Sequence, residues 1–157
     1  MSKVRADKMK DKFLLLQQQL QNMEKMEALP SRSLAQCQLI KLTDIAMESL
    51  ETLDKFEALT ARFVRFNDVL LQKVFRLIDE IDFDHSGTVR DRINRAEKKG
   101  LIDDAREFME IRELRNSIAN EYQPEALNTI FPQVVGYTPV LLQIAGNIRR
   151  YCKQYNQ

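Results

Sequence analysis

Residues 106–122, REFMEIRELRNSIANEY, decide the fold of this chain. The stretch has no glycine or proline and consists mostly of good helix formers until Pro124 stops it. On a helix each residue is turned by about 100° from the last, so the apolar residues gather on one side. They form a stripe of Phe108, Ile111, Ile118, Ala119 and Tyr122. The sequence therefore predicts a helix that packs its striped side against other helices.

Arg115 lies in the middle of this stripe, with apolar residues four positions away on either side. An unpaired guanidinium is costly to bury, so it needs water or a partner. One interpretation is a core helix whose arginine reaches the surface or pairs with a carboxylate. The other is a polar site set into an interface. The neighbouring polar strip consists of Arg112, Glu113, Asn116 and Asn120, and the two asparagines are one turn apart.

The same residues carry a family resemblance. Residues 115–122, RNSIANEY, resemble the Arg-x-x-x-x-His-x-Tyr signature of HEPN domains. These helical proteins include the HepT toxins and the nucleotidyltransferase substrate-binding subunits. Residues 90–102 resemble the helix and Gly-Leu-Ile turn that precede the signature in the substrate-binding branch, and Phe56-Glu57 resembles the Phe-Glu of its earlier long helix. The resemblance covers about residues 44–155, with one departure: the signature histidine is Asn120.

The resemblance implies roles for three positions. In the family, the arginine and histidine are implicated in metal-independent RNA cleavage, with histidine as the general acid or base and arginine on the scissile phosphate. The signature tyrosine can be nucleotidylated by a partner. An amide cannot shuttle a proton, so Asn120 removes the proton-transfer half of this chemistry. Arg115 can still bind a phosphate, and Tyr122 can still donate a hydrogen bond or accept a modification.

The function expected from this resemblance is a HEPN/HepT-like component of a toxin–antitoxin or nucleotidyltransferase pair. It would bind RNA or nucleotide phosphate in the cleft of a homodimer, with nuclease activity absent and a minimal nucleotidyltransferase as partner. The alternative is a non-catalytic helical dimerisation or adaptor protein, in which the polar strip only fixes the register of the dimer.

A second long helical pattern runs from Asp44, a plausible N-cap, to about Ile81 without glycine or proline. It predicts one very long helix or two joined by a kink. Arg62, Arg65 and Asp68 follow one another along it at three-residue steps. These three residues are either a solvated face with an internal ion pair or a binding surface that faces the Arg115 site.

The remaining pattern completes a helical fold. We expect a first helix over residues 2–28, ended by Leu29-Pro30-Ser31, whereas residues 34–42 fit either a short helix or an irregular connector. Thr88 is expected to cap a helix that Gly100 terminates. Thr138-Pro139 is expected to begin a final helix that ends near residue 155. The sequence thus predicts one all-α domain over residues 1–157, an up-and-down bundle of about five helices.

Residues 82–87, DFDHSG, match the oxygen spacing and the glycine that begin an EF-hand loop. The twelfth position, where the bidentate glutamate belongs, is Ile93, so we reject calcium and predict a turn. His85 is the single histidine of the chain. One histidine on a loop does not make a metal site, and we assign it no chemistry.

Composition narrows the class further. The chain has 157 residues, 4 glycines, 4 prolines and 30% charged residues, which suits a helical protein. A net charge of +1 gives no overall electrostatic case for nucleic-acid binding, although a local basic patch is compatible with it. Cys37 and Cys152 are expected to be free thiols. With no signal peptide and no long apolar run, we expect a cytoplasmic protein without membrane contact, metal or cofactor.

Overall fold

The computed structural model describes residues 2–121 and 123–156, and within these ranges it contains helices and no strand. The helices are α1 (Lys3–Gln38), α2 (Leu50–Val69), α3 (Arg76–Ile81), α4 (Val89–Lys98), α5 (Ala105–Asn120) and α6 (Leu127–Cys152). A π-helical segment, Leu70–Phe75, joins α2 to α3 without a break, so the described chain forms five helical units. Short 3-10 turns cover Ile45–Met47, Pro124–Ala126 and Lys153–Asn156. The predicted all-α bundle is confirmed.

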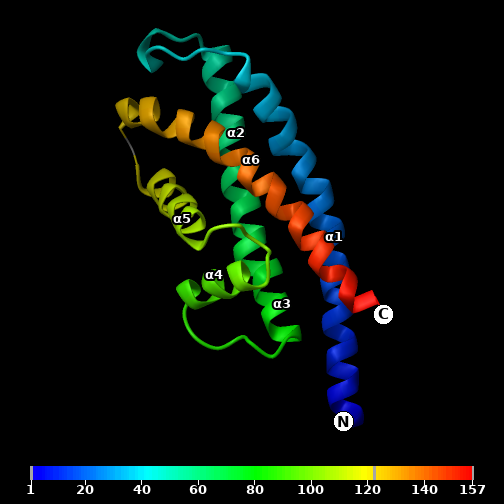
Figure 1. Cartoon of the computed structure of the whole chain (residues 1–157). Helices are drawn as coiled ribbons and strands as arrows, with labels where there is room; N and C mark the ends of the chain where they lie inside the picture. The colour runs from blue at the N-terminus through cyan, green and yellow to red at the C-terminus, as the bar shows by residue number, and fades with distance from the viewer. Residues whose placement is uncertain (1, 122, 157) are drawn as a thin grey trace.

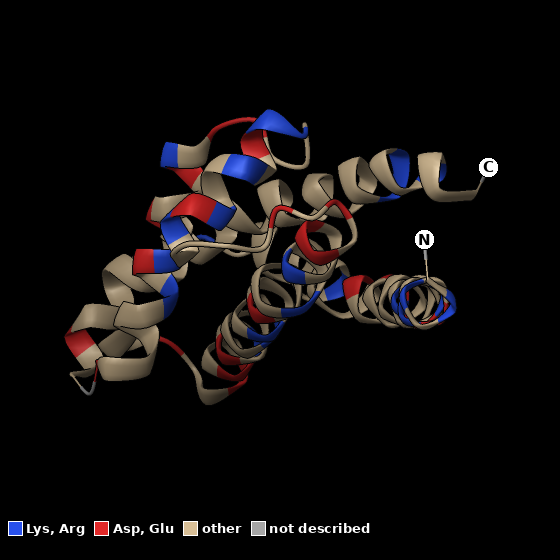
Figure 2. Ribbon diagram, turned by 90° about the horizontal axis from the view of Figure 1, so that it is seen from below, with Lys and Arg blue, Asp and Glu red and all other residues tan. Residues whose placement is uncertain are grey.

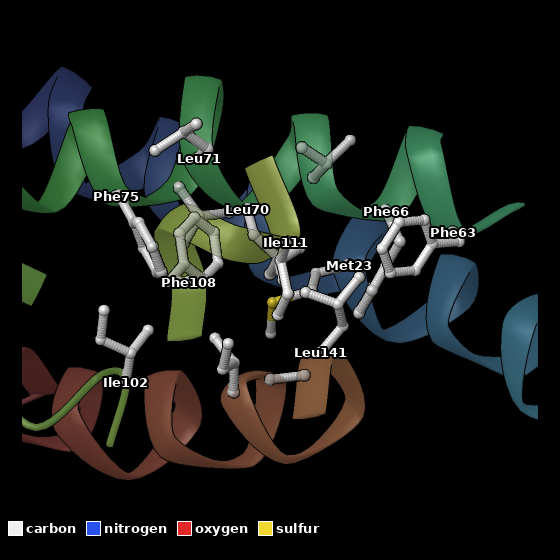
Figure 3. Close-up of a cluster of buried hydrophobic side chains, with 14 of the residues drawn as sticks. Met23, Phe63, Phe66, Leu70, Leu71, Phe75, Ile102, Phe108, Ile111 and Leu141 are labelled. Atoms are coloured by element: carbon white, nitrogen blue, oxygen red, sulfur yellow. The ribbon is translucent and has the colours of Figure 1, made fainter. Parts of the chain in front are cut away.

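The three longest units, α1, α2–α3 and α6, lie side by side and form the body of the bundle (Figure 1). Helices α4 and α5 pack against one flank of α2–α3, and α5 also contacts α6. The core lies between these layers, where α5 inserts Phe108 and Ile111 between the α2–α3 unit and α6 (Figure 3). The Phe108 ring lies 5.5 Å from that of Phe75, measured between centroids.

Two helix boundaries predicted from proline are wrong. Helix α1 does not end before Pro30 but continues to Gln38, which also decides that residues 34–38 are helical. The last turns of α1 are buried against α2, where the Cys37 thiol donates to the Lys55 carbonyl and the Arg62 guanidinium donates to Ser33. Proline removes one backbone hydrogen bond, and this packing outweighs the loss.

The predicted start of the last helix at Thr138-Pro139 is also wrong, because α6 runs unbroken from Leu127. The Thr138 hydroxyl is buried and donates to the Val134 carbonyl at 2.7 Å, so it does not cap a helix N-terminus. Pro132 and Pro139 are seven residues apart and both exposed. They therefore interrupt the hydrogen-bond ladder only on the solvent side of α6.

The predicted limits of α4 are confirmed, whereas the predicted N-cap of α2 is displaced by five residues. Thr88 and Asp91 form the capping box of α4, and Gly100 has the left-handed φ of +77° expected of a terminator. Asp44 caps the short 3-10 turn that follows it, and the N-cap of α2 is Ser49, whose hydroxyl accepts from the Thr52 N–H.

Candidate functional site

The buried stripe of α5 differs from the expected one on its later turns. It consists of Ala105, Phe108, Ile111 and Leu114; Ile118 is half-buried and Ala119 is exposed. Arg115 therefore lies at the border between the buried stripe and the exposed polar strip, rather than inside the stripe. From this border its side chain reaches across to α2.

Arg115 forms a bidentate ion pair with Asp68 of α2. Its Nε donates to Oδ1 and its Nη2 donates to Oδ2, each at 2.8 Å. These hydrogen bonds raise the pKa of Arg115 above its ordinary value, and the group stays charged. The Arg115 side chain is 28% exposed and that of Asp68 is 38% exposed, so the pair sits at the surface between the two helices. The Nη1 group has no partner within the described residues.

The carboxylate of Asp68 lies beside an unusual polar group in the core. Asn67 is 1% exposed, and its amide nitrogen approaches Asp68 Oδ1 at 3.4 Å. The Asn67 amide oxygen is buried and finds no hydrogen-bond partner in the described part of the chain. Both residues lie within the last turn before the π-helical segment, a type of irregularity found frequently at functional sites.

Further arginines lie along the face of the α2–α3 unit that carries Asp68. Arg65, Asp68, Gln72 and Arg76 recur at steps of three and four along the α2–α3 unit and so share one side of it. Arg92 of α4 reaches this side, where its Nη1 donates to the Leu71 carbonyl at 3.3 Å and to Gln72 Oε1 at 3.4 Å. We name the set Arg65, Arg76, Arg92, Arg112 and Arg115 the arginine row.

Arg92 carries the clearest electrostatic signature in the arginine row. Burial lowers its pKa; the nearby Asp79 carboxylate opposes this, and the cations Arg76 and Arg95 lower the pKa in turn. Arg92 and Arg76 also line a cavity of about 140 Å³ together with His85, Glu80 and Asp79. The guanidinium thus lies near carboxylates as well as cations, but it has no hydrogen-bonded carboxylate of its own within the described residues. An anion beside it would offset the burial of its charge.

Two of the other predicted site residues, Arg62 and Asn120, do not converge on Arg115. Arg62 points the opposite way, to α1, where its Nη1 donates to Ser33 Oγ at 2.6 Å and approaches the Leu29 carbonyl. Asn120 is exposed, and its side-chain amide donates to the Asn116 backbone carbonyl at 3.0 Å, which closes the last turn of α5. Tyr122 lies outside the described residues.

The loop after α3 is held by an ion-pair network rather than left open for a cation. The Lys99 ammonium lies 2.7 Å from Asp79, 3.1 Å from Asp82 and 3.6 Å from Asp84. Burial alone would raise the pKa of Asp82, but hydrogen bonds from Tyr151, Tyr155 and Lys99 outweigh burial and hold it below its ordinary value. Lys99 therefore occupies the carboxylates that the EF-hand spacing suggested as calcium ligands.

Three notable residues were missed at the sequence level. Asp79 is 2% exposed and paired with Arg95 and Lys99, and Asn67 is a second buried polar residue of the α2–α3 unit. Asp79 and Asn67 each stand beside residues of the apolar pattern of their helix. That position was the only sign in the sequence that they would be buried. Phe83 has a positive φ of 62° and is exposed, and nothing in its sequence context predicts this.

The two cysteines are buried and unpaired with each other, as expected. Burial raises the pKa of Cys152 to about 12, so its thiol is not a nucleophile at neutral pH. None of the described helices is long and apolar enough to cross a bilayer. Compared with protein-family models, curated proteins and solved structures, the chain gives no significant match.

Proposed function

We propose that this chain is a HEPN/HepT-like component of a toxin–antitoxin or nucleotidyltransferase pair, which binds RNA or nucleotide phosphate through Arg115 without cleaving it. The observation that carries the proposal is the arginine row, which lies along the α2–α3 unit and the helices α4 and α5. Guanidinium groups suit phosphate recognition because their planar fork donates to two oxygens at once.

The charge balance of the arginine row supports anion binding. Five guanidinium groups face two carboxylates that pair with the row: Asp68, which pairs with Arg115, and Glu80, which lies 3.4 Å from Arg76. Asp79 lines the adjoining cavity and attracts Arg92, but its ion pairs are with Arg95 and Lys99, which lie outside the row. This local excess of positive charge favours a polyanion even though the net charge of the chain is only +1.

The Asp68 carboxylate would orient Arg115 for this role. By fixing Nε and Nη2, it holds the guanidinium plane and leaves Nη1 for a ligand. A preorganised arginine loses less conformational entropy when it binds a phosphate. In this proposal Asp68 is a positioning residue and Arg115 is the phosphate ligand.

Asn120 supports binding without cleavage. Its amide is engaged with the Asn116 carbonyl and has no proton to transfer at neutral pH. The single histidine, His85, belongs to the loop after α3 and shares a cavity with Arg76 and Arg92 rather than with Asn120. The general acid or base that the family signature implies beside Arg115 is therefore missing.

We further propose that two copies pair across the exposed polar strip of α5, so that both Arg115 residues and both Asn120 residues line one cleft. The strip is solvent-exposed at Asn116 and Asn120 in the single chain, which leaves it accessible to a second copy. Sedimentation equilibrium that finds only monomer at micromolar concentration would contradict this arrangement. The nucleotidyltransferase partner would be encoded beside this chain, and its absence there would weaken the pairing.

The second candidate is a structural adaptor, and one observation favours it. Arg115 already has a bidentate partner in Asp68, so the charge can serve packing alone. The two candidates differ in what a conservative change at Arg115 does. A structural ion pair tolerates lysine with a loss of stability, whereas a phosphate ligand loses binding because lysine lacks the planar group by which Asp68 holds two donors and leaves Nη1 directed at the ligand.

The test is anisotropy titration of fluorescent single-stranded RNA, combined with thermal unfolding, for the unchanged protein and the Arg115→Lys variant. We expect about tenfold weaker RNA binding, which corresponds to the loss of one charge-assisted hydrogen bond, in a protein that remains folded. Arg106→Lys is the matched control, because Arg106 is exposed on the opposite side of α5. Equal binding by all three proteins would support the adaptor.

The missing acid or base can be tested separately. Asn120→His restores the family signature, and we expect RNA cleavage in this variant but not in the unchanged protein. Asn120→His combined with Arg115→Ala is the control for contaminating nuclease, because it retains the new histidine without the arginine. Cleavage that survives in the double variant would contradict a site built on Arg115.

A further inference from the structure

A groove of about 440 Å³ lies between the N-terminal end of α1 and the loop after α3. It is lined by Arg5, Lys8, Met9, Lys12 and Phe83. Its volume is within the range of small-ligand sites. The groove lies in a different part of the molecule from the arginine row and shares no residue with it.

The positive charge of the groove follows from the helical period of α1. Leu16 is in the core, and the same side of the helix passes through Met9 and Lys12 toward Arg5 and Lys8. This end of α1 extends beyond the other helices, where the core-facing stripe becomes basic (Figure 1). Seen from below, basic residues mark this end of the helix (Figure 2).

The acidic residues of the same segment do not line the groove, although one of them borders it. At about 100° per residue, Asp7 lies about 160° from Arg5 around the helix, whereas Asp11 is three residues from Lys8 and only about 60° away from it. The side of α1 that lines the groove nevertheless contributes no carboxylate to the lining, and Met9 is its apolar floor. Such a side repels other cations and attracts anions.

Phe83 supplies an aromatic face in an unfavourable backbone conformation. Its φ is +62°, rare for a bulky residue, and its side chain is 73% exposed. The residues on either side hold it in place: Tyr151 and Tyr155 bind the Asp82 carboxylate, and the Asp84 N–H donates to the Asp79 carbonyl at 2.7 Å. An exposed aromatic ring held at an unfavourable φ points to a functional role.

We propose that this groove binds a nucleotide unit of single-stranded RNA, with a base stacked on Phe83 and phosphates bound by Arg5, Lys8 and Lys12. Aromatic rings beside cationic side chains recognise single strands in this way, because every base has a stacking face and every linkage has a charge. The inference deepens the proposed function and rests on it. It adds a second contact to the strand, at the far end of the α2–α3 unit from Arg65.

An anionic membrane is the competing occupant, and the shape of the groove disfavours it. A flat bilayer that reached the Phe83 ring would also meet Asp84, which is half exposed although it pairs with Lys99. A single base needs only the ring face and does not approach this carboxylate as a flat surface would. The concave shape of the groove also fits one nucleotide better than a plane.

The experiment measures single-stranded RNA binding at several salt concentrations, using the whole chain throughout. Phe83→Gly removes the ring and relieves the positive φ, so the variant should stay folded and bind about tenfold more weakly. Phe83→Tyr keeps the stacking face and should retain binding. Lys8→Ala with Lys12→Ala should weaken binding and flatten its salt dependence, whereas Lys3→Ala with Lys10→Ala, on the other side of α1, is the matched control.

Each outcome separates the possibilities. If Phe83→Gly binds RNA as the unchanged protein does while Arg115→Lys loses binding, the groove is not part of the strand path and the inference fails alone. If the unchanged protein binds no RNA, the proposed function and the inference fail together. If phosphatidylserine vesicles bind and Phe83→Gly abolishes only that, the groove takes a lipid surface and the inference is overturned.

Discussion

Arg115 and Asp68, 47 residues apart in sequence, meet side by side with two hydrogen bonds of 2.8 Å each. The pair ties α5 to α2 just before the π-helical segment and fixes one guanidinium at the surface. A partly exposed ion pair adds little to the free energy of unfolding. This pair also fixes the direction in which the remaining donor of Arg115, Nη1, points. The contact between Arg115 and Asp68 therefore belongs both to the packing of α5 on α2 and to the candidate site.

A double-mutant cycle measures the structural share of this pair. For Arg115→Ala, Asp68→Ala and the double variant we expect a coupling energy of about 1 kcal/mol in urea unfolding, because both groups are partly exposed. Arg115→Leu should cost no more than about 1 kcal/mol, since water can reach the abandoned Asp68. A coupling above about 3 kcal/mol would mark the pair as a structural element and favour the adaptor.

The pH dependence of stability should follow Asp82 and Lys99. The pKa of Asp82 is lowered on folding, so its contribution is present above the unfolded value of about 3.9 and is lost as pH falls through the folded value. Despite burial, hydrogen bonds to Asp79 and Asp82 raise the pKa of Lys99, whose contribution is present below about 10.4 and lost as pH rises further. Stability should therefore be greatest between these limits.

The variant Asp82→Asn isolates the acidic limb. It should lower the free energy of unfolding at pH 7 by about 2 kcal/mol, because it weakens hydrogen bonds from Lys99 and two tyrosines. The difference from the unchanged protein should begin to shrink below about pH 4, the unfolded value, and should vanish only when pH falls through the lower pKa that Asp82 has in the folded protein. Thermal unfolding from pH 3 to pH 9 provides the comparison, and a difference that grows in acid would refute the assignment.

Two glycines should respond in opposite directions to alanine. Gly136 lies inside α6 with no atom within 4 Å of an added Cβ, so Gly136→Ala should stabilise the protein by about 0.5–1 kcal/mol. Gly100 also has open space but a φ of +77°, so Gly100→Ala should destabilise it by about 1 kcal/mol. Urea unfolding of both variants checks the signs, and equal shifts would be inconsistent with these backbone conformations.

Calcium should leave the protein unchanged. The carboxylates of Asp82 and Asp84 are engaged by the Lys99 ammonium, which a calcium ion would have to displace. We expect no heat of binding in calorimetry and no shift of the unfolding temperature at millimolar calcium. Lys99→Met, which removes the competing charge, is the informative companion variant. Micromolar calcium binding by the unchanged protein would overturn this view of the loop.

The helical class was predictable because scarce glycine and proline and a sustained apolar period act locally. The two errors at Pro30 and Thr138 came from the same local rules. Proline costs about 3 kcal/mol inside a helix, a cost that buried packing on either side can outweigh. A single sequence records the local cost but not the packing that offsets it.

The candidate site was predictable only in part. The spacing of Arg115 showed that it needed a partner, and Asp68 stood among three residues that one of two interpretations placed opposite it. Which of Arg62, Arg65 and Asp68 actually meets Arg115 depends on how α2 and α5 cross, and this is a tertiary property. The left-handed conformation of Phe83 was beyond prediction, because it contradicts the preference of its own residue type.

Phosphate binding by the arginine row is tested most directly by the salt dependence of RNA binding. The slope of log affinity against log salt counts the phosphate charges that a protein neutralises, at about 0.7 per contact for single strands. Replacing Arg65 and Arg112 together by alanine leaves the Arg115–Asp68 pair and the core intact. We expect weaker binding and a slope reduced by about 1.4. An unchanged slope and affinity would contradict phosphate binding by the arginine row.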